Sequence, residues 1–194
     1  MAHRSNKNWL SLLVGPSQAI PRTGSVEEIP SARAAFDFSW LNSDLPEVHQ
    51  LHEGVGIRER RDGALTAEIY VPAGTGPFPT VLYLHGGSWC VGSPEGARRP
   101  AMRIAEQGYV VVNLDYRLAP ERPFPCALED CLYAARWITR NIDRYQGDPL
   151  RLIISGDSAG ANLSAAVIVV LAGIDHPLDE GDLEGVPVRF SGAL

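Results

Sequence analysis

Hydrophobic positions along the middle of the chain follow two different periods. In some stretches apolar and β-branched residues form short runs, as in TVLYL at residues 80–84 and RLIIS at residues 151–155. In others they recur at helical spacing, as Leu128, Leu132 and Ala135 do. Short apolar runs predict buried strands, and a helical period predicts helices with one apolar face. The pattern predicts strands at 55–61, 65–71, 80–84, 109–116 and 151–155, and helices at 95–107, 126–142 and 159–173.

The order of these elements predicts a fold class. Strands that alternate with helices form βαβ units, and such units build a mostly parallel α/β sheet. The first two strands differ, because only Asp62, Gly63 and Ala64 separate them. An Asp-Gly pair between two strand-forming runs is typical of a tight β-hairpin. We therefore expect the parallel sheet to begin with an antiparallel pair.

The pentapeptide GDSAG at residues 156–160 stands where the strand RLIIS gives way to a helix-forming run. A serine on a sharp strand-to-helix turn needs small neighbours, and Gly156 and Gly160 lie two residues before and two after Ser158. The helix that follows aims free amides and its positive dipole end at the same point. The pattern indicates Ser158 as a nucleophile, although serine and aspartate are also ordinary helix N-caps.

A second motif supports the catalytic interpretation. The strand TVLYL ends in His85, Gly86 and Gly87, and two adjacent glycines allow backbone amides to turn toward a ligand. We expect the amides of Gly86, Gly87 and Ala159 to form an oxyanion hole that holds a carbonyl oxygen as it becomes anionic. Loss of one such donor typically costs about 3 to 4 kcal/mol of transition-state stabilisation.

Three motifs in this order, HGGSW at 85–89, DYRLAPE at 115–121 and GDSAG, resemble those of the hormone-sensitive lipase-like carboxylesterases. The family's first motif is usually HGGG, so Ser88 is a departure that leaves both glycines in place. The resemblance implies an α/β-hydrolase fold. It also implies hydrolysis of short or medium acyl esters by a serine nucleophile through an acyl-enzyme, with no cofactor.

The resemblance divides the chain into two parts. Residues 1–50 correspond to an amino-terminal lead-in that contributes to a cap over the site. Residues 51–194 correspond to a partial α/β-hydrolase core that ends at about its sixth strand. We therefore expect the sheet to be truncated at its carboxy-terminal side.

Two groups near the motifs are expected to be structural. Asp115, Arg117 and Glu121 of DYRLAPE can form ion pairs or hydrogen bonds that support their loop, since partly buried charges need partners. His85 is expected to hold the glycine loop through a hydrogen bond. It is not expected to be the base, because the base follows the nucleophile along the chain in this fold.

The sequence assigns neither the acid nor the base of a triad. Asp175 and His176 follow Ser158 in the chain, but a helix over 159–173 would place them roughly 20 Å or more from its hydroxyl. A base must lie within about 3 Å, or one water away. We expect a further carboxy-terminal segment or a second chain to complete the sheet and the triad. The 194 residues alone are then expected to be inactive.

Composition excludes several other functions. The chain has 17 lysines and arginines against 23 aspartates and glutamates, a net charge of -6, so we expect no nucleic-acid partner. No apolar run is long enough to span a bilayer, and the partner we expect is a small-molecule ester. Three cysteines, an odd number, favour a reducing compartment. Without a secretory signal, we expect the cytoplasm.

His49 and His52 could share a helical face, but no cysteine or further ligand stands near them, so we assign no metal site. Two alternative functions stay open. The chain could be a non-catalytic, ligand-binding receptor on the same fold, which keeps the serine without a working histidine. It could also be an inactive truncated product.

Overall fold

Six strands form one mixed sheet in the computed structural model, which describes residues 25–35, 42, 44–61, 63–174, 176–179 and 181–193. Their order across the sheet is β1-β2-β4-β3-β5-β6. β2 pairs antiparallel with both β1 and β4, and the pairs from β4 to β6 are parallel. The expected mostly parallel α/β sheet with an antiparallel start is therefore confirmed. The strands are β1 (Gln50–Arg58), β2 (Leu65–Val71), β3 (Phe78–Leu84), β4 (Val110–Asp115), β5 (Gly147–Gly156) and β6 (Phe190–Ala193).

The hairpin that starts the sheet has a longer connection than the sequence predicts. β1 ends at Arg58, which pairs with Leu65, so residues 59–64 link the two strands. The predicted hairpin is confirmed, but its strands are farther apart in sequence than expected, and the Asp-Gly turn itself includes Asp62, which lies outside the described residues. Within this connection, Arg60 places its guanidinium against a buried carboxylate on the helix α4 (Cys126–Asn141).

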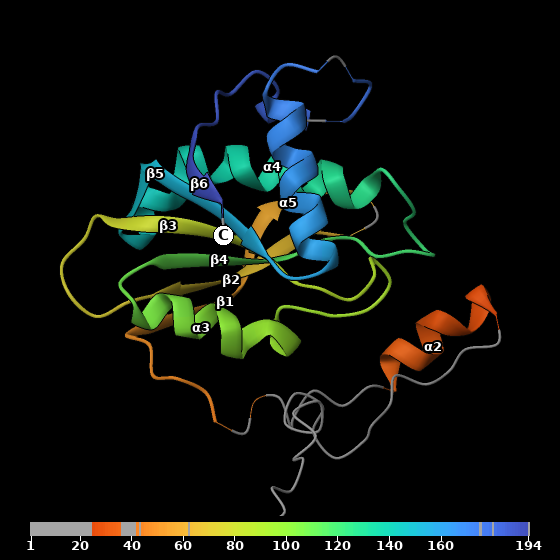
Figure 1. Cartoon of the computed structure of the whole chain (residues 1–194), viewed down its shortest axis with the longest axis horizontal. Coiled ribbons are helices and arrows are strands. Elements are labelled where there is room, and N and C mark those ends of the chain that lie inside the picture. The colour runs from red at the N-terminus through yellow and green to blue at the C-terminus, as the bar shows by residue number, and fades with distance from the viewer. Residues whose placement is uncertain are drawn as a thin grey trace, which may run out of the picture.

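Helices cover both faces of this sheet (Figure 1). α3 (Arg98–Glu106) lies on one face, while α4 and α5 (Ala159–Leu171) lie on the other. α2 (Ile29–Ala34) stands apart from the sheet. The three longer helices agree with the predicted ranges to within a few residues. Short 3-10 helices are η1 (Val26–Glu28), η3 (Glu95–Ala97), η4 (Ile142–Tyr145) and η5 (Gly181–Leu183).

Alternate residues of the central strands face two separate apolar cores. Leu82 and Leu84 of β3 belong to the core beneath α4 and α5, whereas Val81 and Tyr83 belong to the core beneath α3. Side chains alternate between the faces of a sheet, so a strand covered on both sides requires a continuous apolar run. The run TVLYL meets this requirement. It fixes β3 in the middle of the sheet, with the glycine loop at its carboxyl end.

A buried carboxylate joins the loop after β4 to α4 and to the hairpin connection. Asp130 on α4 is fully buried, accepts a hydrogen bond from the Arg117 amide at 2.9 Å and pairs with the Arg117 guanidinium at 2.9 Å. Arg60 pairs with the same carboxylate, and Arg117 also pairs with Glu129 at 3.1 Å. Because an unpaired buried charge is very costly, these groups hold one another in place. The structural role expected for Arg117 agrees with these contacts.

α5 is less deeply buried than its apolar sequence suggests. Leu163 and Val167 face the core, but Val169 is 49% exposed and Ile174, just beyond the helix, is 54% exposed. A helix on one face of a sheet buries only one stripe of its surface. Within the part of the chain that the structure describes, the opposite stripe of α5 remains open.

Much of the predicted lead-in over residues 1–50 cannot be compared with the structure, because residues 1–24, 36–41 and 43 lie outside the described residues. Its described helices are η1 and α2. None of the helices in the described part of the chain combines the length and the apolar character that a membrane crossing requires.

Candidate active site

Ser158 lies at the turn between β5 and α5, where it is the N-cap residue of the helix. Its backbone dihedrals are φ 51 and ψ -113, and it is one of the few described non-glycine residues with a positive φ. Such a conformation costs of order 1–3 kcal/mol and persists only where the surrounding structure enforces it. The turn leaves Ser158 exposed to solvent at the amino end of α5.

The turn is enforced by its close approach to the end of β3. A Cβ atom added to Gly160 would lie 1.8 Å from the carbonyl oxygen of Leu84, and one added to Gly156 would lie 2.5 Å from the same oxygen. No side chain fits at either distance. Small residues are therefore needed on both sides of Ser158 because the turn packs against β3, and at Gly156 also because the backbone of Gly160 lies 2.6 Å from where a Cβ would stand.

Asp157 ties the turn to the loop that follows β3. Its Oδ1 accepts one hydrogen bond from the Gly86 amide at 3.0 Å and another from the Tyr83 hydroxyl at 3.0 Å. Burial, followed by the charge of Asp157, raises the pKa of Tyr83 above its ordinary value, so the phenol keeps its proton and donates it. Asp157 thus positions the glycine loop beside Ser158.

The bond to Asp157 changes what can be expected of Gly86. A backbone amide has one hydrogen, and that of Gly86 already points at the Asp157 carboxylate. Within this arrangement the amide is not free to meet a substrate oxygen. The oxyanion-hole role predicted for Gly86 would require this bond to break, whereas a positioning role requires it to persist.

His85 holds the next peptide in place. Its Nδ1 lies 2.8 Å from the Gly86 carbonyl oxygen, so the proton of the neutral ring resides on Nδ1. The ring stacks on Tyr116 with centroids 4.3 Å apart, and the Tyr116 hydroxyl donates to the His85 carbonyl at 2.5 Å. In a trans peptide the C=O and N–H groups point in opposite directions. With the Gly86 carbonyl held by His85, the Gly87 amide faces the other way.

The loop then closes into a turn that leaves amides unused. The carbonyl of Gly87 accepts hydrogen bonds from the amides of Cys90 at 3.0 Å and Val91 at 2.9 Å. Gly87 has φ 128, a region that residues with a Cβ rarely adopt. The amides of Gly87, Ser88 and Ala159 donate to no acceptor among the described residues. Donors of this kind could stabilise an oxyanion.

An apolar cavity of about 350 Å³ lies next to the loop and the turn. Ser88 of the loop lines it, as does Asn162, whose amide donates to the Ser158 carbonyl at 3.1 Å. Arg117 also reaches it, but carboxylates on α4 already neutralise that charge. Arg122 is a second cation in the lining, and most of the other lining side chains are apolar. Its apolar lining comes from Trp89, Phe124, Ala127, Leu128, Leu163 and Ala166.

No described residue can be identified as the base for Ser158. The Ser158 hydroxyl forms no hydrogen bond with any residue that the structure describes. His85 is 2% exposed and burial lowers its pKa, so it is neutral and engaged with the Gly86 carbonyl. His176 accepts the Leu178 amide at 3.3 Å in the loop beyond α5, and Asp175 lies outside the described residues.

Sequence reasoning passed over Asp157 as a positioning residue. The available signal was its place beside the nucleophile in GDSAG. Its partner Gly86 is 71 positions earlier in the chain, so only the pairing of β3 with β5 brings the two together. Within the described residues, no group of three or more metal-binding side chains could hold a metal ion.

Comparisons with known proteins agree with this geometry. A family model described as the alpha/beta hydrolase fold matches residues 81–178, which is about half of the chain. The chain is 36% identical over 138 residues to the carboxylesterase NlhH of Mycobacterium tuberculosis, an alignment that covers 69% of this chain and 42% of that protein. It is 40% identical over 122 residues to the arylacetamide deacetylase of Oryctolagus cuniculus, which covers 59% and 31%.

Similar solved structures include esterases. An esterase of Pyrobaculum calidifontis superposes with a TM-score of 0.65 at 35% sequence identity, over 74% of this chain and 48% of that one. The chain therefore spans less than half the length of these relatives.

We expect Gly160→Ala to disrupt the nucleophile turn. Its new Cβ would stand 1.8 Å from the Leu84 carbonyl oxygen, so the turn must move away from β3. Overpacking of this kind costs about 1–3 kcal/mol or more. Urea unfolding followed by circular dichroism measures the loss. Gly56→Ala is the control, because a Cβ there meets nothing within 4 Å and the residue is not among the glycines with a positive φ. Equal stability of Gly160→Ala and the parent chain would contradict the packing argument.

We expect stability to fall as the pH drops because of His85. Burial lowers the pKa of His85 in the folded state below the ordinary histidine value of about 6.5, so its contribution to stability is complete above that pH. The contribution is lost as the pH falls through 6.5 toward the folded pKa, because the unfolded state then binds the extra proton. Urea unfolding at several pH values between about 5 and 8 measures this slope. His85→Asn keeps a donor for the Gly86 carbonyl and should show a shallower slope; an unchanged slope would refute the assignment.

Proposed function

The chain belongs to the hormone-sensitive lipase-like carboxylesterase family of the α/β-hydrolase fold, and on that premise we propose that its protein hydrolyses carboxylic esters with Ser158 as the nucleophile. The observation that carries the proposal is the placement of an exposed serine on a strained turn, beside unused backbone amides. A strained conformation at an exposed polar residue is typical of functional sites.

In the proposed reaction, Ser158 Oγ attacks the ester carbonyl carbon and transfers its proton to a histidine base. The amides of Gly87 and Ala159 donate to the carbonyl oxygen as it becomes negative. We assign Gly86 to positioning, because its amide is bound to Asp157. Collapse of the tetrahedral intermediate breaks the bond to the alcohol, which leaves with the proton. Water then attacks the acyl-enzyme by the same route and releases the acid.

We propose that the acid and the base come from residues outside this chain, on a carboxy-terminal segment or a second chain. The exposed apolar stripe on α5 and the position of β6 at the edge of the sheet support this. An unpaired edge and an uncovered apolar face are both liabilities that proteins usually cover. The relatives are more than twice as long as the part that this chain matches.

The cavity beside Ser158 supports an uncharged ester with a short or medium acyl group. A cavity of 150 Å³ can hold benzene, so about 350 Å³ has room for a larger apolar group. One relative is named an arylacetamide deacetylase, which agrees with an aromatic or branched group at this position. For the location of the protein we propose the cytoplasm, on the basis of the odd number of cysteines.

Hydrolysis of 4-nitrophenyl butyrate tests the proposed function. We expect rates close to background for the 194-residue chain and measurable turnover for a longer product of the same gene. In the longer product, Ser158→Ala should lower kcat by about a thousandfold or more. Ser191→Ala, an exposed serine on β6, is the control.

A fluorophosphonate probe should label the longer product at Ser158 and label the 194-residue chain slowly. Turnover by the chain alone would contradict the need for outside residues. A longer product that binds esters but neither turns over nor reacts with the probe would identify a receptor instead of an enzyme.

A larger side chain in the cavity should change substrate preference. We expect Ala166→Phe to lower kcat/KM for medium acyl or aryl esters by roughly tenfold while acetate esters are spared, because the pocket loses room for the larger group. Ala165→Phe is the matched control, since Ala165 is the preceding residue of α5 and points to solvent. Competition kinetics with acetate and hexanoate esters measures the ratio. An equal loss of kcat/KM for the acetate and the hexanoate ester would show that the acyl group does not occupy this cavity.

A further inference from the structure

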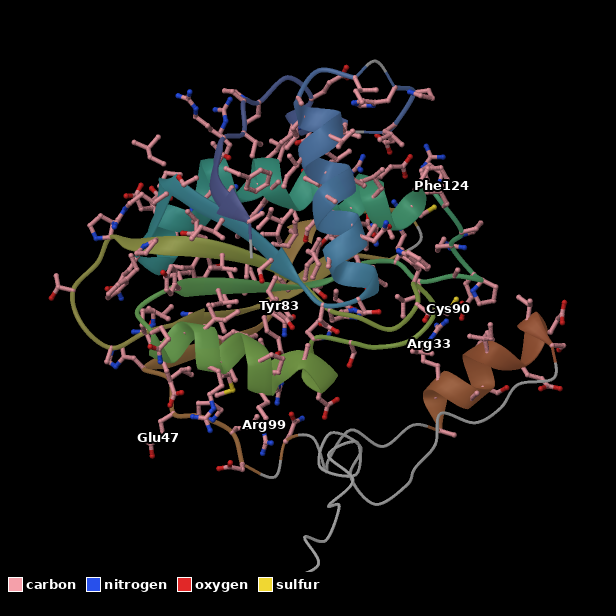
Figure 2. The ribbon with its side chains drawn as sticks, viewed as in Figure 1. Arg33, Glu47, Tyr83, Cys90, Arg99 and Phe124 are labelled. Atoms are coloured by element: carbon pink, nitrogen blue, oxygen red, sulfur yellow. The ribbon has the colours of Figure 1, made fainter. Side chains whose placement is uncertain are left out.

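One side chain from the amino-terminal segment reaches the loop beside Ser158. Arg33 lies on α2, far from the glycine loop in sequence, and Figure 2 shows it directed from α2 toward the loop that carries Cys90. Its side chain is only 22% exposed although the helix itself stands apart from the sheet. An arginine buried to this extent on a detached helix has a specific set of partners.

Arg33 binds three acceptors on two loops. Its Nε donates to the Cys90 carbonyl oxygen at 2.7 Å, and its Nη2 donates to the Ala119 carbonyl oxygen at 2.8 Å. The outer nitrogens also form a two-point contact with the Glu121 carboxylate, each bond 3.0 Å long. The planar guanidinium can make these bonds at once because its donors diverge in a fixed fork.

The Cys90 carbonyl is close to the amides that matter for the proposed reaction. Cys90 donates its own amide to the Gly87 carbonyl, which fixes the peptide between Gly87 and Ser88. The second loop is joined to the first where the Ala119 amide donates to the Trp89 carbonyl at 2.9 Å. Arg33 therefore bonds to both loops at the place where the Ala119–Trp89 hydrogen bond already joins them.

We propose that Arg33 is a positioning residue for the oxyanion loop, and that α2 is part of the active-site wall. The inference rests on the proposed function, because positioning has a catalytic meaning only if the loop holds a substrate oxygen. Arg33 does not contact the reacting atoms. It acts through the Cys90 carbonyl, which restrains the turn from Gly87 to Val91 and so the direction of the unused amides.

A surface ion pair with Glu121 would be a weaker explanation. Exposed pairs contribute little, and the Glu121 side chain is 43% exposed. The two hydrogen bonds to carbonyl oxygens distinguish the two explanations. An ion pair needs only a positive charge, whereas positioning of the loop needs the several diverging donors of the guanidinium. Lysine keeps the charge but cannot reach both carbonyls and the carboxylate with the same geometry.

Hydrogen exchange on the 194-residue chain tests the restraint directly, without any need for activity. We expect Arg33→Met and Arg33→Lys each to speed exchange at the amides of Cys90 and Val91 by about tenfold, because the turn opens more often. Glu121→Gln should have a smaller effect, since both carbonyl bonds remain. Ser31→Ala, on the exposed side of α2, is the matched control and should leave exchange unchanged.

Kinetics of the chain completed by the proposed carboxy-terminal segment test the catalytic meaning. We expect Arg33→Lys to lower kcat for 4-nitrophenyl butyrate by about tenfold with KM changed less than about twofold, because misaligned donors affect the transition state more than substrate binding. If Arg33→Lys keeps both the kcat and the slow exchange of the unsubstituted protein, the proposal is overturned in favour of a simple ion pair. Faster exchange with unchanged kcat would show a restraint that has no role in catalysis.

The two measurements separate the inference from the proposed function. If no form of the protein hydrolyses esters, the exchange experiment still decides whether Arg33 restrains the loop. If hydrolysis occurs but exchange at Cys90 and Val91 is the same in every Arg33 variant, the function stands and the positioning role fails.

Discussion

The contact between the nucleophile turn and the end of β3 is the constraint on which the candidate site depends. The Leu84 carbonyl oxygen occupies space that a side chain at Gly156 or Gly160 would need, so β5 can turn sharply into α5 only with glycine at both positions. This packing holds Ser158 in its positive-φ conformation. It also brings Asp157 within reach of the Gly86 amide. Serine, loop and helix end therefore form one unit, and no part of it can shift independently.

Charged groups then fix the loops around this unit from outside the apolar cores. Asp130 is buried with two arginines, and it anchors the start of the DYRLAPE loop to α4. Arg33 spans that loop and the glycine loop through carbonyl oxygens. Irregular loops have few backbone partners of their own, so side chains must supply the missing hydrogen bonds. In the glycine loop, the Gly86 amide, the Gly86 carbonyl and the Gly87 carbonyl are occupied, whereas the Gly87 and Ser88 amides donate to no described acceptor.

The sequence predicted most of what is local and missed what depends on distant partners. The strands, the helices and the turn around Ser158 follow from periodicity and from glycine spacing, which are properties of neighbouring residues. The sequence indicated an oxyanion-hole role for Gly86 but not its contact with Asp157, because that carboxylate lies 71 residues away in the chain. The hairpin was predicted but the length of its connection was not, and Arg60 in that connection pairs with the distant Asp130. Arg33 carried no sequence signal at all.

The described residues provide the backbone groups around Ser158 but no base, and the two differ in what the fold must supply. A nucleophile turn and an oxyanion loop need only two adjacent parallel strands, and β3 with β5 supplies both within one packed core. Their chemistry relies on backbone amides, whose positions are fixed once the strands pair. A base is different, because a titratable side chain must be delivered to within about 3 Å of the serine oxygen by another element. His85, which is buried close to the turn, binds its own loop instead. The pairing of β3 with β5 therefore places Ser158 beside free backbone amides within one packed core, while none of the described side chains is delivered to it as a base.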